Sequence, residues 1–157
     1  MGRHSGIFAQ GLEAMTTPSL TDNDYRALAL FRRALRRFLN FSGQAAIAAG
    51  LEPQQYQAML ALRGTGDGSA MTVGELAEEL QIRPHSAVGL VTRLARQELV
   101  TREKGSADRR QVFVTLTPRG RELLAGLAAA HKDELRKAVP ALRTLIEQLD
   151  TTVLNSP

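Results

Sequence analysis

The segment from residue 72 to residue 116 places the strongest constraint on the fold of this chain. Two short amphipathic stretches, residues 72–80 and 84–94, run directly into a basic segment, residues 99–116, with the features of a β-hairpin. Two helices joined by a tight turn and followed by a two-stranded ribbon form a compact unit. Its second helix fits the major groove of duplex DNA, and the ribbon tip reaches the backbone or minor groove beside it. The sequence therefore predicts a DNA-binding unit.

Local signals set the bounds of these elements. Thr72 and Glu75 have the spacing of a capping box, so a helix is expected to begin there. Pro84 suits the first turn of the second helix, whose predicted inner face includes Val88, Val91 and Leu94. Apolar and other residues alternate over 112–116, which predicts a strand after a turn at residues 105–108. The segment is thus expected to form helix, turn, helix and a two-stranded wing.

Helices are also predicted on both sides of this unit. Thr21 can cap a helix that fades near residues 43–50, and Pro53 suits the start of the next. That second helix is expected to turn four residues inward: Tyr56, Met59, Leu60 and Leu62. Thr117 precedes a further helix, which Pro140 is expected to break, so that a separate last helix follows.

The predicted fold class is mainly α with a small β-wing, a winged helix-turn-helix flanked by dimerisation helices. We divide the chain into a flexible tail (1–20), an N-terminal dimerisation helix (21–50), the winged lobe (51–118) and C-terminal dimerisation helices (119–157). The apolar faces at the two ends have no evident partner in the chain except each other. Packing them against a second copy would bury apolar surface, so a symmetric homodimer is expected.

Composition excludes several other classes. The 157 residues contain no cysteine, so there are no disulfides and no thiolate metal sites. No apolar run approaches the roughly 20 residues that span a bilayer, and no secretory signal is evident, so we expect a cytoplasmic protein without membrane contact. The three histidines lack metal-ligand spacing, and no nucleophile or acid–base constellation is present. We expect no metal, no cofactor and no enzymatic activity.

Positive charge is concentrated in the predicted DNA-binding unit. The net charge of the whole chain is +4, and residues 83–110 alone carry seven Arg or Lys against three acids. Residues 52–80 are acidic by contrast. Such a concentration favours phosphate contact through counterion release, although a charge cluster taken alone is more often a solvated face.

Three stretches resemble the MarR (multiple antibiotic resistance regulator) family: residues 72–80 (TVGELAEEL), 86–94 (SAVGLVTRL) and 108–120 (DRRQVFVTLTPRG). The most specific part is the wing signature Asp-x-Arg, then a strand and Leu-Thr-x-x-Gly, present as Asp108, Arg110, Leu116, Thr117 and Gly120. The order of predicted helices matches from about residue 22 to residue 149, which is most of the chain.

The resemblance implies a homodimeric winged helix-turn-helix transcription factor, usually a repressor. It implies that the helix over residues 84–97 enters the major groove and that Arg110 enters the adjacent minor groove, oriented by Asp108. It also implies that a small aromatic or phenolic effector can change the separation of the two reading lobes. The sequence departs from the family at Arg83, where Ser or Thr often caps the reading helix, and at Glu98, where Gly is frequent.

The candidate DNA-binding residues lie on the reading helix and the wing: Arg83, His85, Ser86, Gly89, Arg93, Arg102, Lys104, Asp108, Arg109 and Arg110. Arg110 either pairs with Asp108 on a solvated hairpin or enters a narrow minor groove, and the wing signature favours the second. Arg93 is expected to bind guanine or phosphate. His85 is equally consistent with DNA contact and with an inert surface position.

Four further residues are candidates for an effector pocket: Phe38, Phe41, Tyr56 and Met59. Core packing explains the same residues and is the more frequent outcome. His131 lies on an apolar stripe, where a hydrogen-bonded interior histidine is expected. Two functions from other classes compete with a DNA-binding regulator: a winged-helix module that binds protein without sequence-specific DNA binding, and, far behind, an enzyme.

Overall fold

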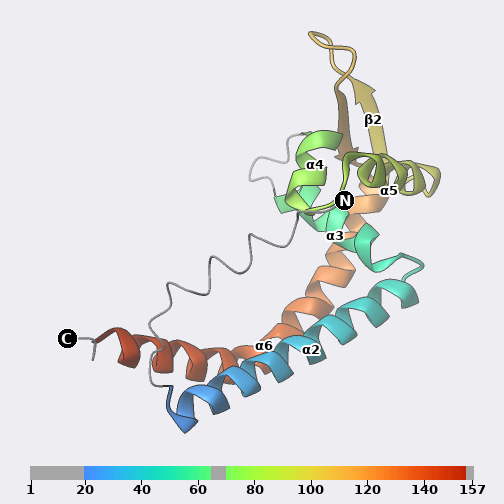
Figure 1. Cartoon of the computed structure of the whole chain (residues 1–157). Helices are drawn as coiled ribbons and strands as arrows, with labels where there is room; N and C mark the ends of the chain where they lie inside the picture. The colour runs from blue at the N-terminus through green and yellow to red at the C-terminus, as the bar shows by residue number, and fades with distance from the viewer. Residues whose placement is uncertain (1–19, 65–69, 155–157) are drawn as a thin grey trace, which may run out of the picture. The chain divides into compact units, whose positions relative to one another are not determined.

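The computed structural model describes residues 20–64 and 70–154. Its elements are shown in Figure 1: helices α2 (Asp22–Ala48), α3 (Pro53–Gly64), α4 (Val73–Glu79), α5 (Pro84–Arg96) and α6 (Pro118–Leu154), and strands β1 (Met71–Thr72), β2 (Val100–Lys104) and β3 (Val112–Leu116). The predicted class, mainly α with a small β-wing, is confirmed. The predicted tail over residues 1–20 lies outside the described residues, except for residue 20. Within the described part of the chain, no helix is long and apolar enough to span a bilayer.

The described chain forms two compact units. One unit contains residues 20–34 and 139–154, and the other contains residues 35–138. All three strands and helices α3, α4 and α5 lie in the second unit, which we call the lobe. The geometry described below belongs to the lobe unless the first unit is named.

The lobe packs its helices around the sheet. Its core contains Met59, Leu76, Leu90, Leu94 and Val114, each with no exposed surface. The sheet is antiparallel with the strand order β1-β3-β2. Val114 pairs with Met71 on one side and with Arg102 on the other. The core thus anchors the centre of the sheet beneath the reading helix.

The predicted two-stranded wing is a three-stranded sheet. Residues 71 and 72 form the additional strand β1, which pairs with β3 directly before α4 begins. A strand of two residues is too short to show an alternating pattern, so only its partner in the folded chain defines it. Its last residue, Thr72, is also the N-cap of α4.

The capping box at the start of α4 is confirmed. The backbone N–H of Glu75 donates to the Thr72 hydroxyl over 3.1 Å, and the backbone N–H of Thr72 donates to the Glu75 carboxylate over 2.7 Å. Hydrogen bonds from the backbone N–H and the hydroxyl of Thr72 lower the pKa of Glu75. The helix start is therefore specified by two residues alone, as the sequence predicted.

Two residues predicted to face the core are exposed. Val88 on α5 is 53% exposed, and Leu60 on α3 is 45% exposed. The buried stripe of α5 is Ala87, Leu90, Val91 and Leu94, which keeps the three-and-four spacing of a helix but is rotated from the predicted face. Several apolar residues occur close together in α5, so its pattern is compatible with more than one rotation about the helix axis, and packing on the sheet selected this one.

The predicted break at Pro140 is wrong. Helix α6 continues through this residue, from Pro118 to Leu154. Proline removes one backbone N–H and disfavours a helix interior, but good helix formers such as alanine, leucine and arginine lie on both sides. The hydroxyl of Thr144 donates to the Pro140 carbonyl oxygen over 3.1 Å. One long helix therefore replaces the two that were expected.

Left-handed residues end the two helices of the helix-turn-helix. Gln81 has φ 54° after α4, and Glu98 has φ 59° after α5. In each case two backbone N–H groups close the helix end, for example Glu98 to the Ala95 carbonyl and Leu99 to the Leu94 carbonyl, both at 3.0 Å. This is the Schellman arrangement. The family that the sequence resembles frequently has glycine at the second position, and the backbone of this chain requires the same conformation there.

Replacing Glu98 by glycine is expected to raise the free energy of unfolding by up to about 1 kcal/mol. The left-handed conformation costs a residue with a Cβ about 1–2 kcal/mol, and the entropy of glycine offsets part of the gain. The ion pair from Glu98 to Arg119, at 3.4 Å, is exposed and contributes little. Urea unfolding measures the difference. Gln97→Gly, at a neighbouring position with φ −86°, should lower the stability, and equal effects of the two variants would contradict this account.

The Leu-Thr-x-x-Gly segment at the start of α6 is hydrogen-bonded to the residues that follow α5. The Thr117 hydroxyl donates to the Glu98 carbonyl over 2.7 Å and accepts the N–H of Gly120 over 2.9 Å. The N–H of Thr117 donates to the Leu99 carbonyl oxygen over 3.0 Å. A Cβ on Gly120 would lie 2.1 Å from that same oxygen. Glycine is therefore required here for space.

Candidate nucleic-acid interface

Helix α5 presents a polar face to solvent. His85, Ser86, Arg93 and Arg96 are exposed, while Gly89 and Thr92 are partly buried. Arg83 is the N-cap of α5, and its side chain makes no capping hydrogen bond. The helix begins without a capping side chain because a guanidinium carries only donors and cannot accept a backbone N–H; Pro84, which has no N–H of its own, occupies the first turn. The exposed face therefore carries the predicted reading residues, with Arg83 directly before it.

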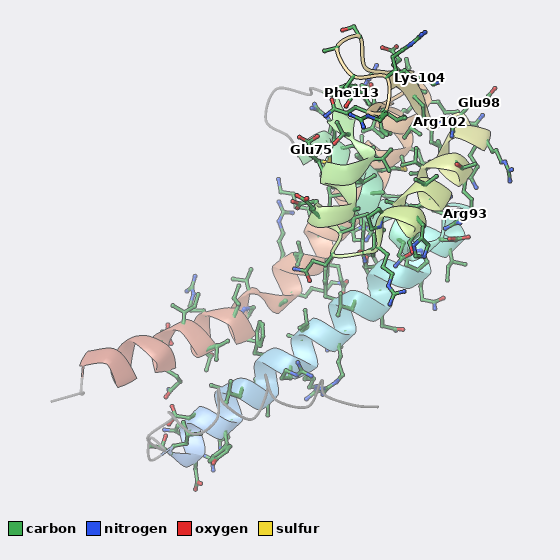
Figure 2. All side chains as sticks on the ribbon, turned by 45° about the horizontal axis from the view of Figure 1, so that its top comes forward. Glu75, Arg93, Glu98, Arg102, Lys104 and Phe113 are labelled. Carbon is green, nitrogen blue, oxygen red and sulfur yellow. The ribbon has the colours of Figure 1, made fainter. Side chains whose placement is uncertain are left out.

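Strand β2 carries the basic residues of the wing. Arg102 and Lys104 are both exposed, and the hairpin of β2 and β3 extends beyond α4 and α5 (Figure 1). Figure 2 shows Arg102 and Lys104 on this hairpin and Arg93 on the reading helix. The structure thus brings the predicted residues of helix and wing together in one lobe.

The wing tip holds Arg110 in a defined position. Oδ1 of Asp108 accepts the backbone N–H of Arg110 over 2.9 Å and the side-chain Nε–H over 3.2 Å. The Arg110 side chain is nevertheless 92% exposed. Nε is thus the guanidinium nitrogen that the carboxylate engages. The pair thus forms an oriented, projecting guanidinium, and Arg109 beside it is also exposed.

A close backbone approach shapes the wing turn. A Cβ on Gly105 would lie 2.7 Å from the carbonyl oxygen of Asp108 and 3.1 Å from the Phe113 ring. The N–H of Gly105 donates to the Gln111 carbonyl over 2.9 Å, which closes the turn. The absence of a side chain at residue 105 therefore permits the turn that places Asp108 and Arg110.

One hydrogen bond links the wing to the reading helix. Nη1 of Arg102 donates to the Thr92 hydroxyl over 3.3 Å, and that hydroxyl donates to the Val88 carbonyl over 2.8 Å. The site prediction omitted Thr92, Val88 and Arg96. The spacing of Thr92 and Arg96 predicts exposure, whereas that of Val88 predicted the core. The rotation of α5 brings Val88 to the exposed side, where its methyl groups are available to a thymine methyl.

Arg93 has an unexpected partner. Its Nη2 lies 3.2 Å from Oε2 of Glu52, the residue directly before α3. The sequence predicted the exposed position of Arg93 but not this ion pair, because the two residues are separated by 41 positions and share no local motif. The pair fixes the guanidinium on one flank of α5.

Three of the four predicted effector-pocket residues surround His131. The ring of Tyr56 stacks on His131 with centroids 4.2 Å apart, and Phe38 and Phe41 meet it edge-on at 6.0 and 5.5 Å. Met59 has no exposed surface and belongs to the core. Burial raises the pKa of the Tyr56 hydroxyl, which favours its neutral form. The aromatic residues form a packed cluster on three helices of the lobe.

His131 is the hydrogen-bonded interior histidine that the sequence predicted. It is 4% exposed, and its Nδ1 lies 2.7 Å from the Leu127 carbonyl oxygen. A carbonyl only accepts, so Nδ1 carries the proton, and in the neutral ring Nε2 accepts from the Ser42 hydroxyl over 2.9 Å. Among the side chains that the structure describes, in residues 20–64 and 70–148, no three His, Asp or Glu side chains gather in a way that could hold a metal ion.

These features define a winged helix-turn-helix protein with a basic reading helix and a basic wing. Residues 49–111 match the sequence model of the MarR family. An HTH-type transcriptional regulator of Bacillus subtilis is 32% identical over 86 residues, which cover 55% of this chain and 57% of the relative. This chain therefore spans just over half the length of that relative.

Solved structures share the fold. The MarR family regulator AbsC of Streptomyces coelicolor aligns with a TM-score of 0.67 and 24% identity, over 87% of this chain and 93% of that one. The regulator BpsR of Bordetella bronchiseptica aligns with a TM-score of 0.60 and 27% identity, over 82% and 93%. Residues 49–111 are thus similar to the MarR family, and the fold is that of MarR-family winged helix-turn-helix transcriptional regulators. The family comprises regulators and not enzymes, in agreement with the sequence prediction.

Proposed function

We propose that this protein is a homodimeric, sequence-specific DNA-binding repressor that a small molecule releases from its operator. The observation that carries the proposal is the wing tip, where Asp108 orients an Arg110 side chain that is 92% exposed. An isolated, projecting arginine suits a narrow minor groove, in which the negative potential is strongest. A solvated hairpin has no need for an arginine that is held at Nε and free at its other nitrogens.

The reading helix would lie in the major groove beside the wing. His85, Ser86 and Arg93 then face base edges or phosphates, with Gly89 allowing close approach of the helix backbone. Arg102, Lys104 and Arg109 would bind phosphates, and Arg83 would do so at the helix start. Such a protein acts where the chromosome is, so we place it in the cytoplasm.

The first unit supports a homodimer. Its exposed apolar side chains are large and lie on both segments: Leu20, Tyr25, Leu28, Leu30, Val139, Leu142 and Ile146. A second copy that covered these side chains would gain about 25 cal/mol for each Å² of apolar surface removed from water. Two-fold symmetry would present two reading helices to successive major grooves on one face of the duplex.

The aromatic cluster supports an aromatic or phenolic effector. In the similar regulator BpsR, DNA binding is regulated by 6-hydroxynicotinic acid. In this chain Phe38, Phe41 and Tyr56 surround the His131 ring. An aromatic ligand that displaced part of this packing could use the same stacking and edge contacts. Because α2, α3 and α6 all contribute residues to the cluster, such binding would act on these three helices.

Selection of bound sites from random duplex DNA tests the proposal. The expected result is an enriched inverted repeat with half-sites about 10 base pairs apart, centre to centre. Analytical ultracentrifugation should show a dimer, free and bound. If the chain binds only weakly, with salt-sensitive affinity that is the same on every sequence, sequence-specific repression is wrong and the winged-helix interaction module is favoured.

A further inference from the structure

The ion pair between Glu52 and Arg93 joins the reading helix to the residue that precedes α3. Nη2 of Arg93 and Oε2 of Glu52 are 3.2 Å apart, and the two side chains are 44% and 56% exposed, Arg93 first. An exposed pair of this kind contributes little to folding. Its position on the reading helix suggests a role other than stability.

The backbone of Glu52 is held firmly. Its N–H donates to Oε1 of Gln55 over 2.8 Å, and its carbonyl oxygen accepts the N–H of Gln55 over 2.9 Å. The Gln55 side chain is almost fully buried, with 2% exposure. The Glu52 carboxylate therefore extends from an anchored position, and the Arg93 guanidinium is held against it.

The guanidinium also lies close to the helix surface. A Cβ on Gly89 would be 3.5 Å from Nη1 of Arg93. Gly89 is one helical turn before Arg93, and side chains on a helix point toward that preceding turn. Arg93 is thus confined between Glu52 and the backbone at Gly89, with Nη2 engaged and its other donors available.

We propose that Glu52 is a positioning residue that makes Arg93 a reader of bases in the major groove. This inference rests on the proposed function. An unrestrained arginine binds phosphates on any sequence. A guanidinium held in one orientation donates only to acceptors whose positions match its N–H groups, such as O6 and N7 of guanine. The wing uses the same arrangement, in which Asp108 holds Arg110. A carboxylate beside Arg93 also disfavours nearby phosphates. Glu52 therefore increases discrimination between sequences and not overall affinity.

Glu52→Gln tests the proposal when compared with Glu78→Gln. Both variants remove one negative charge from the lobe, and Glu78 is exposed on α4 with no ion pair among the described residues. The Kd values are measured for an inverted repeat selected by the unchanged chain and for the same bases scrambled, at one salt concentration. The quantity compared is the Kd for the scrambled DNA divided by the Kd for the selected DNA. We expect this ratio to fall about fivefold or more in Glu52→Gln. The ratio should stay within about twofold in Glu78→Gln, and circular dichroism should show both variants folded.

The same substitution in an Arg93→Ala background identifies the mechanism. If Glu52 acts through Arg93, Glu52→Gln changes the ratio by less than about twofold once Arg93 is absent. Three results would overturn the proposal while the repressor function stands. The Kd ratio could fall equally with and without Arg93, it could fall as much in Glu78→Gln as in Glu52→Gln, or it could stay unchanged in Glu52→Gln. Failure of the unchanged chain to select any sequence would instead overturn the proposed function, and the role of Glu52 with it.

Discussion

Gly120→Ala is expected to destabilise the protein by about 3 kcal/mol or more, at the upper end of the usual cost of overpacking. The added Cβ would lie 2.1 Å from the Leu99 carbonyl oxygen and 3.0 Å from its carbon. These are backbone atoms in the junction between α5 and β2, so they cannot move away as the end of a flexible side chain can. The Leu99 carbonyl also accepts the N–H of Thr117. Chemical unfolding followed by circular dichroism measures the loss.

Gly126→Ala is the matched control for this variant. Gly126 lies in the same helix, is exposed, and has nothing within 4 Å of an added Cβ. Alanine is favoured over glycine inside a helix by about 0.5–1 kcal/mol, so this variant should be slightly more stable than the unchanged chain. If Gly120→Ala were as stable as Gly126→Ala, the junction would not be as tightly packed as the structure shows.

Arg110→Ala is expected to cause the largest loss of operator binding among single substitutions. We expect a cost on the order of 1–3 kcal/mol, the range for an arginine that reads bases, which is roughly five- to 150-fold in Kd. Because the side chain is 92% exposed and pairs with Asp108 on the same wing tip, folding and dimerisation should be unchanged. Fluorescence anisotropy with a selected site measures the Kd, and thermal unfolding checks the fold.

Arg109→Ala distinguishes a base contact of Arg110 from sequence-independent electrostatic attraction to DNA. It removes the same charge from the neighbouring exposed position of the wing tip. We expect a smaller loss that is equal on selected and scrambled DNA, together with a reduced dependence of Kd on salt. If the two variants lose the same affinity on every sequence, Arg110 is a phosphate contact and its assignment to the minor groove is wrong.

Several features of this protein follow from sequence because they depend on residues close together in the chain. Thr72 and Glu75 specify the start of α4, and Asp108 with Arg110 specifies the wing tip. The chemistry of each pair is complete within four residues, so a pattern is enough to predict it. The fold class followed in the same way, because the order of these local signals matches one known arrangement.

Other features depended on contacts that no local pattern contains. The spacing of Val88 fitted the core, but packing of α5 selected a stripe that leaves it 53% exposed. Pro140 lowered the helix tendency without ending α6. Strand β1 exists only because Met71 and Thr72 meet β3.

The sequence by itself determined the winged helix-turn-helix, its charge and the arginine at the wing tip, because short-range hydrogen bonding and charge concentration are encoded in neighbouring residues. Only the tertiary structure decided the rotation of α5, the aromatic cluster around His131 and the pairing of Glu52 with Arg93. These depend on packing between helices whose residues are distant in the chain. The physical reason is that many rotations and pairings satisfy the same apolar pattern, and side-chain packing in the core selects one of them.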